Sequence, residues 1–440
     1  MPWACFGLRI ADRAAPRHVR CPMNHEPDIV IIGAGAAGIG AARRLVEHGR
    51  APLLLEALPR AGGRAWTRQI AGMTLDLGCE WLHSADRNAW TRIAEASGFA
   101  VDRREPGWTS QYRGLGFAPE EQEAARAEFA AWTERVVTAP PASDCAADAL
   151  AADGRWTAYV QALSCFISGD ELERISARDY AAYEMASTDH NWRLPAGYGT
   201  LITSSLPKAA TLRLGTPVDS LSLDGRRVAL RTQAGTLHAR AVIVTVSTAV
   251  LAGDRLDLPP SLDPWRDAAT RLPLGQNEKL FLEIVGDSPF EPETRVLGDP
   301  HDPSTGTYNI RPHGRTVIGC FLGGAGARHA AASGHEAAFA RAIDQLAALF
   351  GNDVRRCLRP LAASDWAATA SIGGGYSHAL PGQAEARIAL AQPYDGRIFF
   401  AGEATSRTDF STAHGAFESG LRAADEVLAV LADSAGAASC

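Results

Sequence analysis

The stretch Asp28-Ile-Val-Ile-Ile-Gly-Ala-Gly-Ala-Ala-Gly38 decides the fold of this chain of 440 residues. The four residues after Asp28 are apolar and β-branched, which indicates a buried parallel strand, and a glycine turn follows directly. The pattern then predicts a helix over residues 39–49 and a second buried strand over residues 52–56, which ends at Glu56. This order of strand, glycine turn, helix, strand and acid predicts an α/β dinucleotide-binding unit of the Rossmann type.

Each position of the glycine turn has a physical role in binding a dinucleotide. Gly33 permits the tight turn, Gly35 lets the backbone approach a pyrophosphate, and Gly38 lets the helix pack on the strand. The N-terminus of the helix presents unpaired N–H groups and a positive dipole end to the phosphates. Glu56 is placed to accept hydrogen bonds from ribose hydroxyls. The alternative, a glycine-rich turn without a ligand, is disfavoured because the whole context of the motif is present.

Composition and charge argue against several classes of function. Hydrophobic residues make up 46% of the chain and the net charge is −7, which gives no indication of a nucleic-acid partner. No apolar run reaches the roughly 18 residues that a membrane-spanning helix requires. The eight cysteines are scattered, which indicates free thiols in a reducing compartment and a cytoplasmic location. Cys79 and His83 stand four residues apart, but no second cluster of ligands completes a site, so we expect no metal.

Residues 1–26 precede the first strand and are expected to form a disordered N-terminal extension. The arginines of this segment occur without an apolar core, which argues against a secretory signal. Two interpretations stay open: translation begins at Met23, or the segment is an Arg-rich targeting peptide. Asp12 and the lack of serine weigh against the second interpretation.

The sequence Pro59-Arg-Ala-Gly-Gly-Arg64, shortly after the acid, resembles the GG-R signature of the flavin amine oxidases. The resemblance to the monoamine and polyamine oxidases of this family extends from about Asp28 to Leu431. It implies that the cofactor is FAD, because this signature is not usual in simple NAD dehydrogenases. The glycine pair suits a close passage of the backbone beside the phosphates, to which Arg64 would offer a charge-assisted contact.

Two further blocks contain candidate catalytic residues. Asp76-Leu-Gly-Cys-Glu-Trp-Leu-His83 is similar to the loop that passes the flavin ring in polyamine-type oxidases, where the histidine faces the substrate. The alternative for His83 is a buried histidine that donates to a backbone carbonyl. In Gly275-Gln-Asn-Glu-Lys-Leu-Phe-Leu282, the resemblance places Lys279 where a lysine contacts flavin N5 through a water and steadies the reduced, anionic flavin. The alternative for Lys279 is a solvated lysine at the start of a strand.

The C-terminal part contains the aromatic block of the family. Trp366 precedes Ala370-Ser-Ile-Gly-Gly-Gly-Tyr-Ser377, and the resemblance places Tyr376 against the flavin. Gly375 stands where monoamine oxidases carry the cysteine that bonds covalently to the flavin. A glycine cannot form that bond, so FAD is expected to be held noncovalently.

The last strand and helix are also similar to flavin-binding elements. Residues 397–403 are predicted to form a strand ending in Gly402 and Glu403, which in the family meet the phosphates and the ribityl chain. A helix then begins at Thr412, and the N–H groups of Thr412 and Ala413 would stabilise negative charge on the reduced ring. Threonine replaces the second cage tyrosine of the monoamine oxidases, as in the polyamine and lysine-demethylase branches.

These motifs give a set of catalytic candidates and a larger set of FAD-binding candidates. The catalytic candidates are Lys279, Tyr376, His83 and Trp366. The FAD-binding candidates are Gly33, Gly35, Ala37, Gly38, Glu56, Ala57, Gly63, Arg64, Gly78, Cys79, Glu80, Trp81, Val218, Gly402, Glu403, Thr412 and Ala413. Of these, Val218 is assigned to the adenine side.

The predicted fold class is α/β, with a Rossmann-like FAD-binding domain of the glutathione-reductase type and a substrate domain of a mixed sheet plus helices. Alternation over residues 227–232 fits a half-exposed antiparallel strand, and helices are expected over residues 119–136 and 336–350. The FAD-binding domain is assigned to residues 27–106, 197–259 and 365–440, and the substrate domain to residues 107–196 and 260–364.

The function implied by the resemblance is FAD-dependent amine oxidation. A hydride passes from the amine α-carbon to flavin N5, water hydrolyses the imine, and O2 reoxidises the flavin to give hydrogen peroxide. The expected partners are a small amine and O2, with no nucleic acid or membrane and with the oligomeric state open. Glu80, His83, Asp189 and Asn191 could meet a second amino group, which favours a polyamine.

Several alternatives stay open. No carboxylate-clamping arginine is evident in the sequence, which weakens an L-amino-acid oxidase without excluding it. A flavin desaturase or protoporphyrinogen-oxidase-like enzyme shares the GG-R block, but Lys279 and the blocks around His83 and Tyr376 argue against it. A flavin-bearing scaffold protein is the non-enzymatic alternative, and the chain shows no long heptad run to support it.

Overall fold

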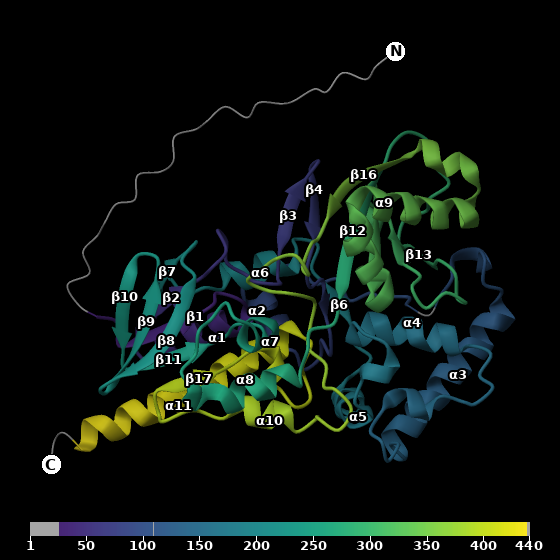
Figure 1. The fold of residues 1–440 in the computed structure, drawn as a ribbon. Helices are drawn as coiled ribbons and strands as arrows, with labels where there is room; N and C mark the ends of the chain where they lie inside the picture. The colour runs from purple at the N-terminus through teal and green to yellow at the C-terminus, as the bar shows by residue number, and fades with distance from the viewer. Residues whose placement is uncertain (1–25, 109, 438–440) are drawn as a thin grey trace.

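The computed structural model describes residues 26–108 and 110–437, with side chains up to residue 432 at the C-terminal end. Residues 1–25 of the expected N-terminal extension lie outside the described residues. Figure 1 shows two lobes, one built around β1 and α11 and the other around β12, α9 and α3. Within the described part of the chain, no helix is long and apolar enough to cross a membrane.

The first lobe is built on a parallel sheet with β1 at its centre, as the opening motif predicts. Alternate residues of β1 face opposite sides: Ile29 and Ile31 pack toward helices α1 and α11, and Val30 and Ile32 pack toward the other face. The strands in order across this sheet are β17 (Ile398–Phe400), β11 (Ala241–Val244), β1 (Ile29–Ile32), β2 (Leu53–Leu55) and β7 (Thr211–Arg213).

Helices α1 (Ala36–Glu47) and α11 (Ala413–Ala437) lie side by side on one face of this sheet (Figure 1). α1 begins directly after Gly35, three residues before the predicted start, so the last glycine of the motif lies inside its first turn. A Cβ at Gly40 would lie 2.5 Å from the carbonyl oxygen of Phe417, so glycine permits the close approach of the two helices. α11 begins at Ala413, next to the predicted position.

An antiparallel ribbon covers the other face of the parallel sheet. Its strands are β8 (Val218–Asp224), β9 (Arg227–Thr232) and β10 (Gly235–Ala239). The antiparallel pairing of residues 227–232 is confirmed, and the predicted alternation holds except at Ala229: Val228, Leu230 and Thr232 are buried, and Arg231 is exposed. Val228 and Leu230 pack with Val30 and Ile32, so the apolar face of this strand covers the parallel sheet.

The second lobe contains a sheet that was expected to be mixed and is antiparallel in every pairing. Two of its four pairings join strands that follow each other in the chain, and such links favour antiparallel pairs; the other two pair strands far apart in the sequence. Its strands in order are β13 (Thr294–Leu297), β14 (Thr307–Ile310), β15 (Val317–Gly323), β12 (Asn277–Ile284) and β16 (Leu358–Ala363). The α/β class itself is confirmed, with the Rossmann-type parallel sheet in the first lobe.

Helix α9 (Gly324–Phe350) covers one face of this antiparallel sheet and leaves the other face for the cavity described below. Ala338, Phe339 and Leu346 of α9 pack with Leu280 and Leu282 of β12. The helix begins at Gly324 rather than at the predicted residue 336, and Gly334 interrupts it with φ of 81°. The glycines before residue 336 concealed this first part, because glycine disfavours a helix interior.

The remaining elements connect the lobes and enclose the space between them. α3 begins at Pro119 as predicted, with Glu120 and Glu121 in its first turn, where the helix dipole favours acids. The helices are α2 (Ala89–Ala96), α3 (Pro119–Thr138), α4 (Thr157–Ser168), α5 (Ala177–Ala186), α6 (Tyr198–Ser204), α7 (Thr248–Ala252), α8 (Asp263–Thr270) and α10 (Ala386–Ala391). The two small ribbons are β3 (Thr67–Ile70) with β4 (Met73–Asp76), and β5 (Trp81–Leu82) with β6 (Trp192–Arg193).

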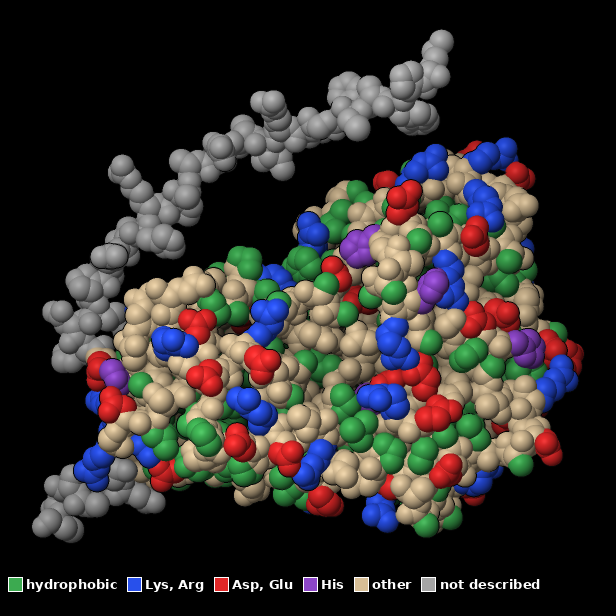
Figure 2. All heavy atoms as spheres, in the orientation of Figure 1, with side chains coloured by type: hydrophobic (Ala, Val, Ile, Leu, Met, Phe, Trp, Pro, Cys, Tyr) green, Lys and Arg blue, Asp and Glu red, His purple; other side chains and the backbone are tan. Residues whose placement is uncertain are grey.

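The surface carries both signs of charge. On the face drawn in Figure 2, Lys and Arg side chains alternate with Asp and Glu over both lobes, and no basic patch gathers there.

Candidate active site

One large cavity runs between the two lobes. Its volume is about 1320 Å³, and it extends from the glycine turn at Gly33 to the exposed face of the antiparallel sheet around Lys279. Sites for a single small molecule measure roughly 300–1,000 Å³, so this cavity has room for a dinucleotide and a small substrate together. The first end lies at the carboxyl ends of β1 and β2, where open α/β sheets bind their ligands.

Most of the predicted site residues line this cavity. Gly38 and Gly402 do not: a Cβ at Gly38 would lie 2.1 Å from the carbonyl oxygen of Gly33, so its role is packing, and Gly402 donates its N–H to Ser419 Oγ at 2.9 Å. The predicted residues on the wall are Gly33, Gly35, Ala37, Glu56, Ala57, Gly63, Arg64, Gly78, Cys79, Glu80, Trp81, His83, Val218, Lys279, Trp366, Tyr376, Glu403, Thr412 and Ala413.

Two glycine-rich segments meet at the first end, and together with Glu56 they form the dinucleotide cradle (residues 33–38, Glu56 and residues 62–64). The N–H of Gly62 donates to the carbonyl oxygen of Ala34 at 2.8 Å, and a Cβ at Gly63 would lie 3.3 Å from the Cα of Gly35. Backbone N–H groups are thus brought together without side chains in the way, which suits a pyrophosphate.

Glu56 is fixed within the dinucleotide cradle by the backbone. Its carboxylate accepts hydrogen bonds from the N–H of Ala34 at 2.7 Å and of Leu58 at 2.9 Å. Burial raises the pKa of Glu56, against these hydrogen bonds, which lower it. A carboxylate has about four acceptor positions, so Glu56 keeps capacity for the ribose hydroxyls assigned to it.

Arg64 has a partner that the sequence did not suggest. Its Nη1 donates to Glu403 Oε1 at 3.0 Å and to the carbonyl oxygen of Gly375 at 2.6 Å. Burial opposes the charge of Glu403, but the nearby charge of Arg64 and a hydrogen bond from Ser377 lower its pKa. The guanidinium therefore ties the second glycine segment to the loop after β17, and its predicted contact with a phosphate stays a prediction.

Lys279 lies on β12 with its side chain in the cavity wall. Its Nζ donates to Glu80 Oε2 at 2.8 Å and to the carbonyl oxygen of Asp76 at 3.1 Å, and the side chain is 14% exposed. Burial raises the pKa of Glu80, but the charge and hydrogen bond of Lys279 outweigh it and lower the pKa overall. The solvated alternative for Lys279 is therefore wrong, and Glu80 is already paired with this lysine.

Aromatic residues close the wall beside Gly375. Trp366 donates its indole N–H to the carbonyl oxygen of Leu77 at 3.1 Å, and the hydroxyl of Tyr376 donates to the carbonyl oxygen of Phe166. A Cβ at Gly375 would lie 2.7 Å from Asn277 Oδ1, so the packing itself requires glycine at this position. Cys79 also lines the cavity, and burial raises the pKa of its thiol to about 12, which leaves it protonated and a poor nucleophile.

His83 is buried at the cavity but does not donate to a backbone carbonyl. Its Nδ1 donates to Asn191 Oδ1 at 2.7 Å, and its own carbonyl oxygen accepts from Asn88 Nδ2 at 2.9 Å. Burial lowers the pKa of His83 to about 4, so the ring is neutral at neutral pH. Its Nε2 is then an acceptor on the wall of the cavity, next to the substrate region.

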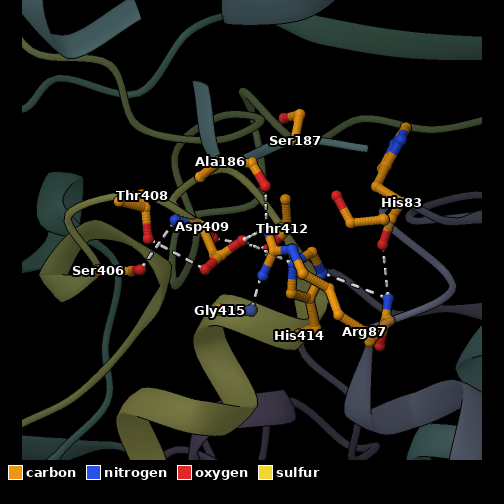
Figure 3. Close-up of polar contacts among 12 residues, drawn as sticks. His83, Arg87, Ala186, Ser187, Ser406, Thr408, Asp409, Thr412, His414 and Gly415 are labelled. Atoms are coloured by element: carbon orange, nitrogen blue, oxygen red, sulfur yellow. Dashed lines mark hydrogen bonds and ion pairs between the residues drawn. The ribbon is translucent and has the colours of Figure 1, made fainter. Parts of the chain in front are cut away.

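An ion-pair network holds the start of α11 against the cavity (Figure 3). Thr412 Oγ1 donates to the carbonyl oxygen of Asp409 at 2.6 Å and accepts from the N–H of Gly415 at 3.0 Å. The carboxylate of Asp409 pairs with Arg87 and with His414 Nε2, the latter at 3.0 Å. Burial raises the pKa of Asp409, but His414 and Arg87 outweigh it and hold the pKa well below its usual range.

Sequence reasoning missed this network and much of the antiparallel face. Arg87 is 322 positions from Asp409 in the sequence, and nothing local to either residue signals their contact. On the sheet, alternate residues of each strand face the cavity, which a four-residue strand is too short to reveal. These cavity-facing residues, here called the substrate wall, are Asn277, Lys279, Phe281, Arg295, Leu297, Thr307, Asn309, Gly319 and Phe321.

The described residues contain no cluster of three or more His, Cys, Asp or Glu side chains able to hold a metal ion. The dinucleotide cradle is formed instead by glycines, the N-terminus of α1 and the carboxylate of Glu56, which is the chemistry that a dinucleotide requires. The residues present therefore fit FAD.

Comparison with known proteins finds two matching family models. The model of flavin containing amine oxidoreductases matches residues 102–428, and that of NAD(P)-binding Rossmann-like domains matches residues 31–96. Polyamine oxidase 3 of Oryza sativa subsp. japonica is 27% identical, over 92% of this chain and 89% of its own length. Polyamine oxidase 2 of Arabidopsis thaliana is 26% identical, over 91% of this chain and 88% of its own. Lysine-specific histone demethylase 1B of Mus musculus is 25% identical, over 94% of this chain and 54% of its own.

Proposed function

The chain belongs to the flavin containing amine oxidoreductases and binds FAD noncovalently, and on that premise we propose that it oxidises a small amine at the carbon next to nitrogen, with O2 as the final acceptor. The observation that carries the proposal is a single cavity that joins the dinucleotide cradle, the N-terminus of α11 and Lys279. FAD, when bound, supplies the two-electron acceptor for the hydride of that C–H bond, and O2 takes the electrons to give H2O2.

The chain's own residues bind and orient the reactants. The N–H groups at the start of α11, beside Thr412 and Ala413, lie on the cavity wall and favour negative charge there. Lys279, held by Glu80, adds a fixed cation to the substrate wall. Trp366 and Tyr376 line the cavity and supply aromatic surface that would exclude water from the bound amine.

His83 offers a hydrogen-bond acceptor at the substrate end of the cavity. Its Nδ1 is committed to Asn191, and burial keeps the ring neutral, so Nε2 can accept a hydrogen bond from an N–H of the amine. A pKa of about 4 makes the ring too weak a base to take the proton of an ammonium, so the amine binds in its neutral form, after losing that proton to water. Water then hydrolyses the imine product to a carbonyl compound and an amine or ammonia.

The polyamine substrate suggested by the sequence stays a prediction. The names of the plant relatives favour it, and Glu184 and Asp189 line the cavity as candidate partners of an ammonium group. Glu80 weakens the argument, because its carboxylate is already paired with Lys279. The scattered free cysteines support a reaction in a reducing, cytoplasmic compartment.

The proposal is tested by mixing the purified holoenzyme with mono-, di- and polyamines and amino acids without oxygen. We expect at least one of them to bleach the flavin absorbance, and oxygen then to restore it with one H2O2 for each amine oxidised. A protein with intact FAD that no amine reduces would contradict the proposal and favour the scaffold alternative. A substrate oxidised at a carbon–carbon bond, with no imine or carbonyl product, would favour a desaturase.

A further inference from the structure

The substrate wall carries two cations, at its two edges. Pairing across the strands sets Arg295 of β13 beside Asn309, then Gly319, then Phe281 of β12, in one row. Lys279 lies in the next row, on the same strand as Phe281. Both cations point into the cavity, and both lie near Glu80: Lys279 through its hydrogen bond and Arg295 through its charge.

Arg295 differs from Lys279 and Arg64 because it has no carboxylate partner. Lys279 pairs with Glu80 and Arg64 with Glu403, whereas Arg295 forms no ion pair with any carboxylate of the described residues. Its hydrogen bonds go only to the hydroxyl of Thr307, at 3.2 and 3.4 Å, and its Nη1 is buried without a partner. A buried guanidinium nitrogen left in this state is unfavourable unless a ligand completes it.

The positive charge of Arg295 persists at neutral pH. Burial lowers its pKa to about 10, and the nearby charge of Glu80 opposes that shift. The carboxylate of Glu80 is hydrogen-bonded to Lys279 and not to Arg295, so it compensates the guanidinium only in part, through its nearby charge. The ring of Trp108 also lines the cavity, with its centroid 5.9 Å from the guanidinium carbon of Arg295.

In the same row as Arg295, and two strands away from it, the wall has a hollow at Gly319. A Cβ built there would make only ordinary contact with Phe281, at 3.5 Å, so packing does not require glycine at this position. The missing side chain leaves space between Asn309 and Phe281, within one strand spacing of Asn309 and about two of Arg295, at roughly 4.8 Å each. Asn309 adds an amide donor beside the guanidinium.

We propose that Arg295, assisted by Asn309, binds a carboxylate of the substrate, so that the preferred amine is one that carries a carboxylate, as an amino acid does. This inference rests on the proposed amine oxidation and specifies its substrate class. The planar fork of arginine matches a carboxylate with two parallel hydrogen bonds. A polyamine would instead bring two or more ammonium groups toward Arg295, a cation that has no carboxylate partner.

The first test compares amines that differ only in the carboxylate: leucine with 3-methylbutylamine, ornithine with 1,4-diaminobutane, and 4-aminobutanoate with propylamine for a distal acid group. In the wild-type holoenzyme we expect the carboxylated member of at least one pair to have a kcat/KM at least tenfold higher. In Arg295→Met that preference should fall by about 10- to 100-fold, mostly through KM, with Arg295→Lys between the two. The uncarboxylated amines should be unaffected or improved.

A second readout does not depend on turnover. We expect 3-phenylpropanoate and 4-methylpentanoate, which have no amino group, to shift the visible spectrum of the oxidised flavin on titration and to raise the Tm. Arg295→Met should weaken this binding about 10- to 100-fold. Arg356→Met, which removes a surface arginine paired with Asp353, is the matched charge control and should bind like the wild type. FAD content and Tm of Arg295→Met, with Arg295→Gln as a second variant, verify that the site is folded.

The outcomes separate this inference from the proposed function. If amines reduce the flavin but the carboxylated members are not preferred, or Arg295→Met leaves the preference and the carboxylate affinity unchanged, the carboxylate site is wrong and amine oxidation stands. If no amine reduces the flavin but carboxylates bind and Arg295→Met weakens them, the site stands and amine oxidation is wrong.

Discussion

The dinucleotide cradle and the substrate wall bind their ligands in opposite ways. The cradle works through backbone groups brought close by missing side chains, at Gly33, Gly35 and Gly63. The substrate wall works through side chains that alternate along four strands, such as Lys279 and Arg295. A substitution in the cradle therefore moves the backbone and weakens the binding of the whole cofactor. A substitution in the wall alters one contact with the substrate.

The sharpest way to break this comparison is to add a side chain in each region. Gly38→Val should destabilise the protein by about 3 kcal/mol and abolish FAD binding, because its Cβ would lie 2.1 Å from the carbonyl oxygen of Gly33. Gly319→Ala, in the wall, should keep full FAD content. FAD-to-protein absorbance ratios and urea unfolding measure both effects. A FAD-loaded Gly38→Val protein with wild-type stability would show that the cradle does not depend on this close contact.

The next largest effect is expected at Lys279. Lys279→Met should keep FAD but slow flavin reduction or reoxidation by about 10²-fold or more, since it removes a fixed cation from the wall. Stopped-flow absorbance measures each half-reaction separately. The loss of Lys279 also raises the pKa of Glu80, so Lys279→Met with Glu80→Gln, which removes the unpaired acid, is the matched control. Unchanged kinetics in Lys279→Met would remove the lysine from the mechanism.

The same contrast explains how much of the molecule could be predicted from the sequence. The first part of the cradle could be predicted because residues 33–38 and Glu56 belong to one continuous strand–turn–helix–strand unit, whereas residues 62–64 were assigned by resemblance. Lys279 could be placed only by resemblance, and its pairing with Glu80 required the fold. Arg295 could not be recognised, because the alternation of a four-residue strand does not tell which side faces the cavity.

Tertiary contacts account for the other differences. The sequence does not predict the start of α9, because glycines such as Gly324 and Gly334 disfavour a helix. This part of α9 is stabilised by tertiary packing, since Ala327 and Ala330 are buried against the sheet. Arg64 was assigned to a phosphate and pairs with Glu403, a residue more than three hundred positions away. Contacts across such separations are fixed by the packing of whole elements, and no local pattern carries them.

A pH experiment sharpens the comparison at the substrate end. The pKa of His83 is lowered to about 4 in the folded protein, so between its ordinary value near 6.5 and 4 the unfolded chain binds more protons. Its contribution to stability is therefore present above pH 6.5 and is lost as the pH falls toward 4, with a slope of at most about 1.4 kcal/mol per pH unit. Urea unfolding of His83→Gln, which cannot titrate, should show a shallower fall over this window. If the stability of His83→Gln and of the wild type falls equally with pH between 6.5 and 4, the pKa of His83 is not lowered by folding.

The smallest effect is expected at Thr412, where the two regions meet at the start of α11. Its hydroxyl accepts the N–H of Gly415 at 3.0 Å and donates to the carbonyl oxygen of Asp409, so it caps the helix. Thr412→Ala should lower the free energy of unfolding by about 1 kcal/mol, and Thr412→Ser, which keeps the hydroxyl, should restore most of it. Because Asp409 remains paired with Arg87 and His414, the helix start stays in place and FAD content should not change. Loss of FAD in Thr412→Ala but not in Thr412→Ser would instead show that this hydroxyl positions the helix N-terminus for the cofactor, and would assign the cap to the cradle.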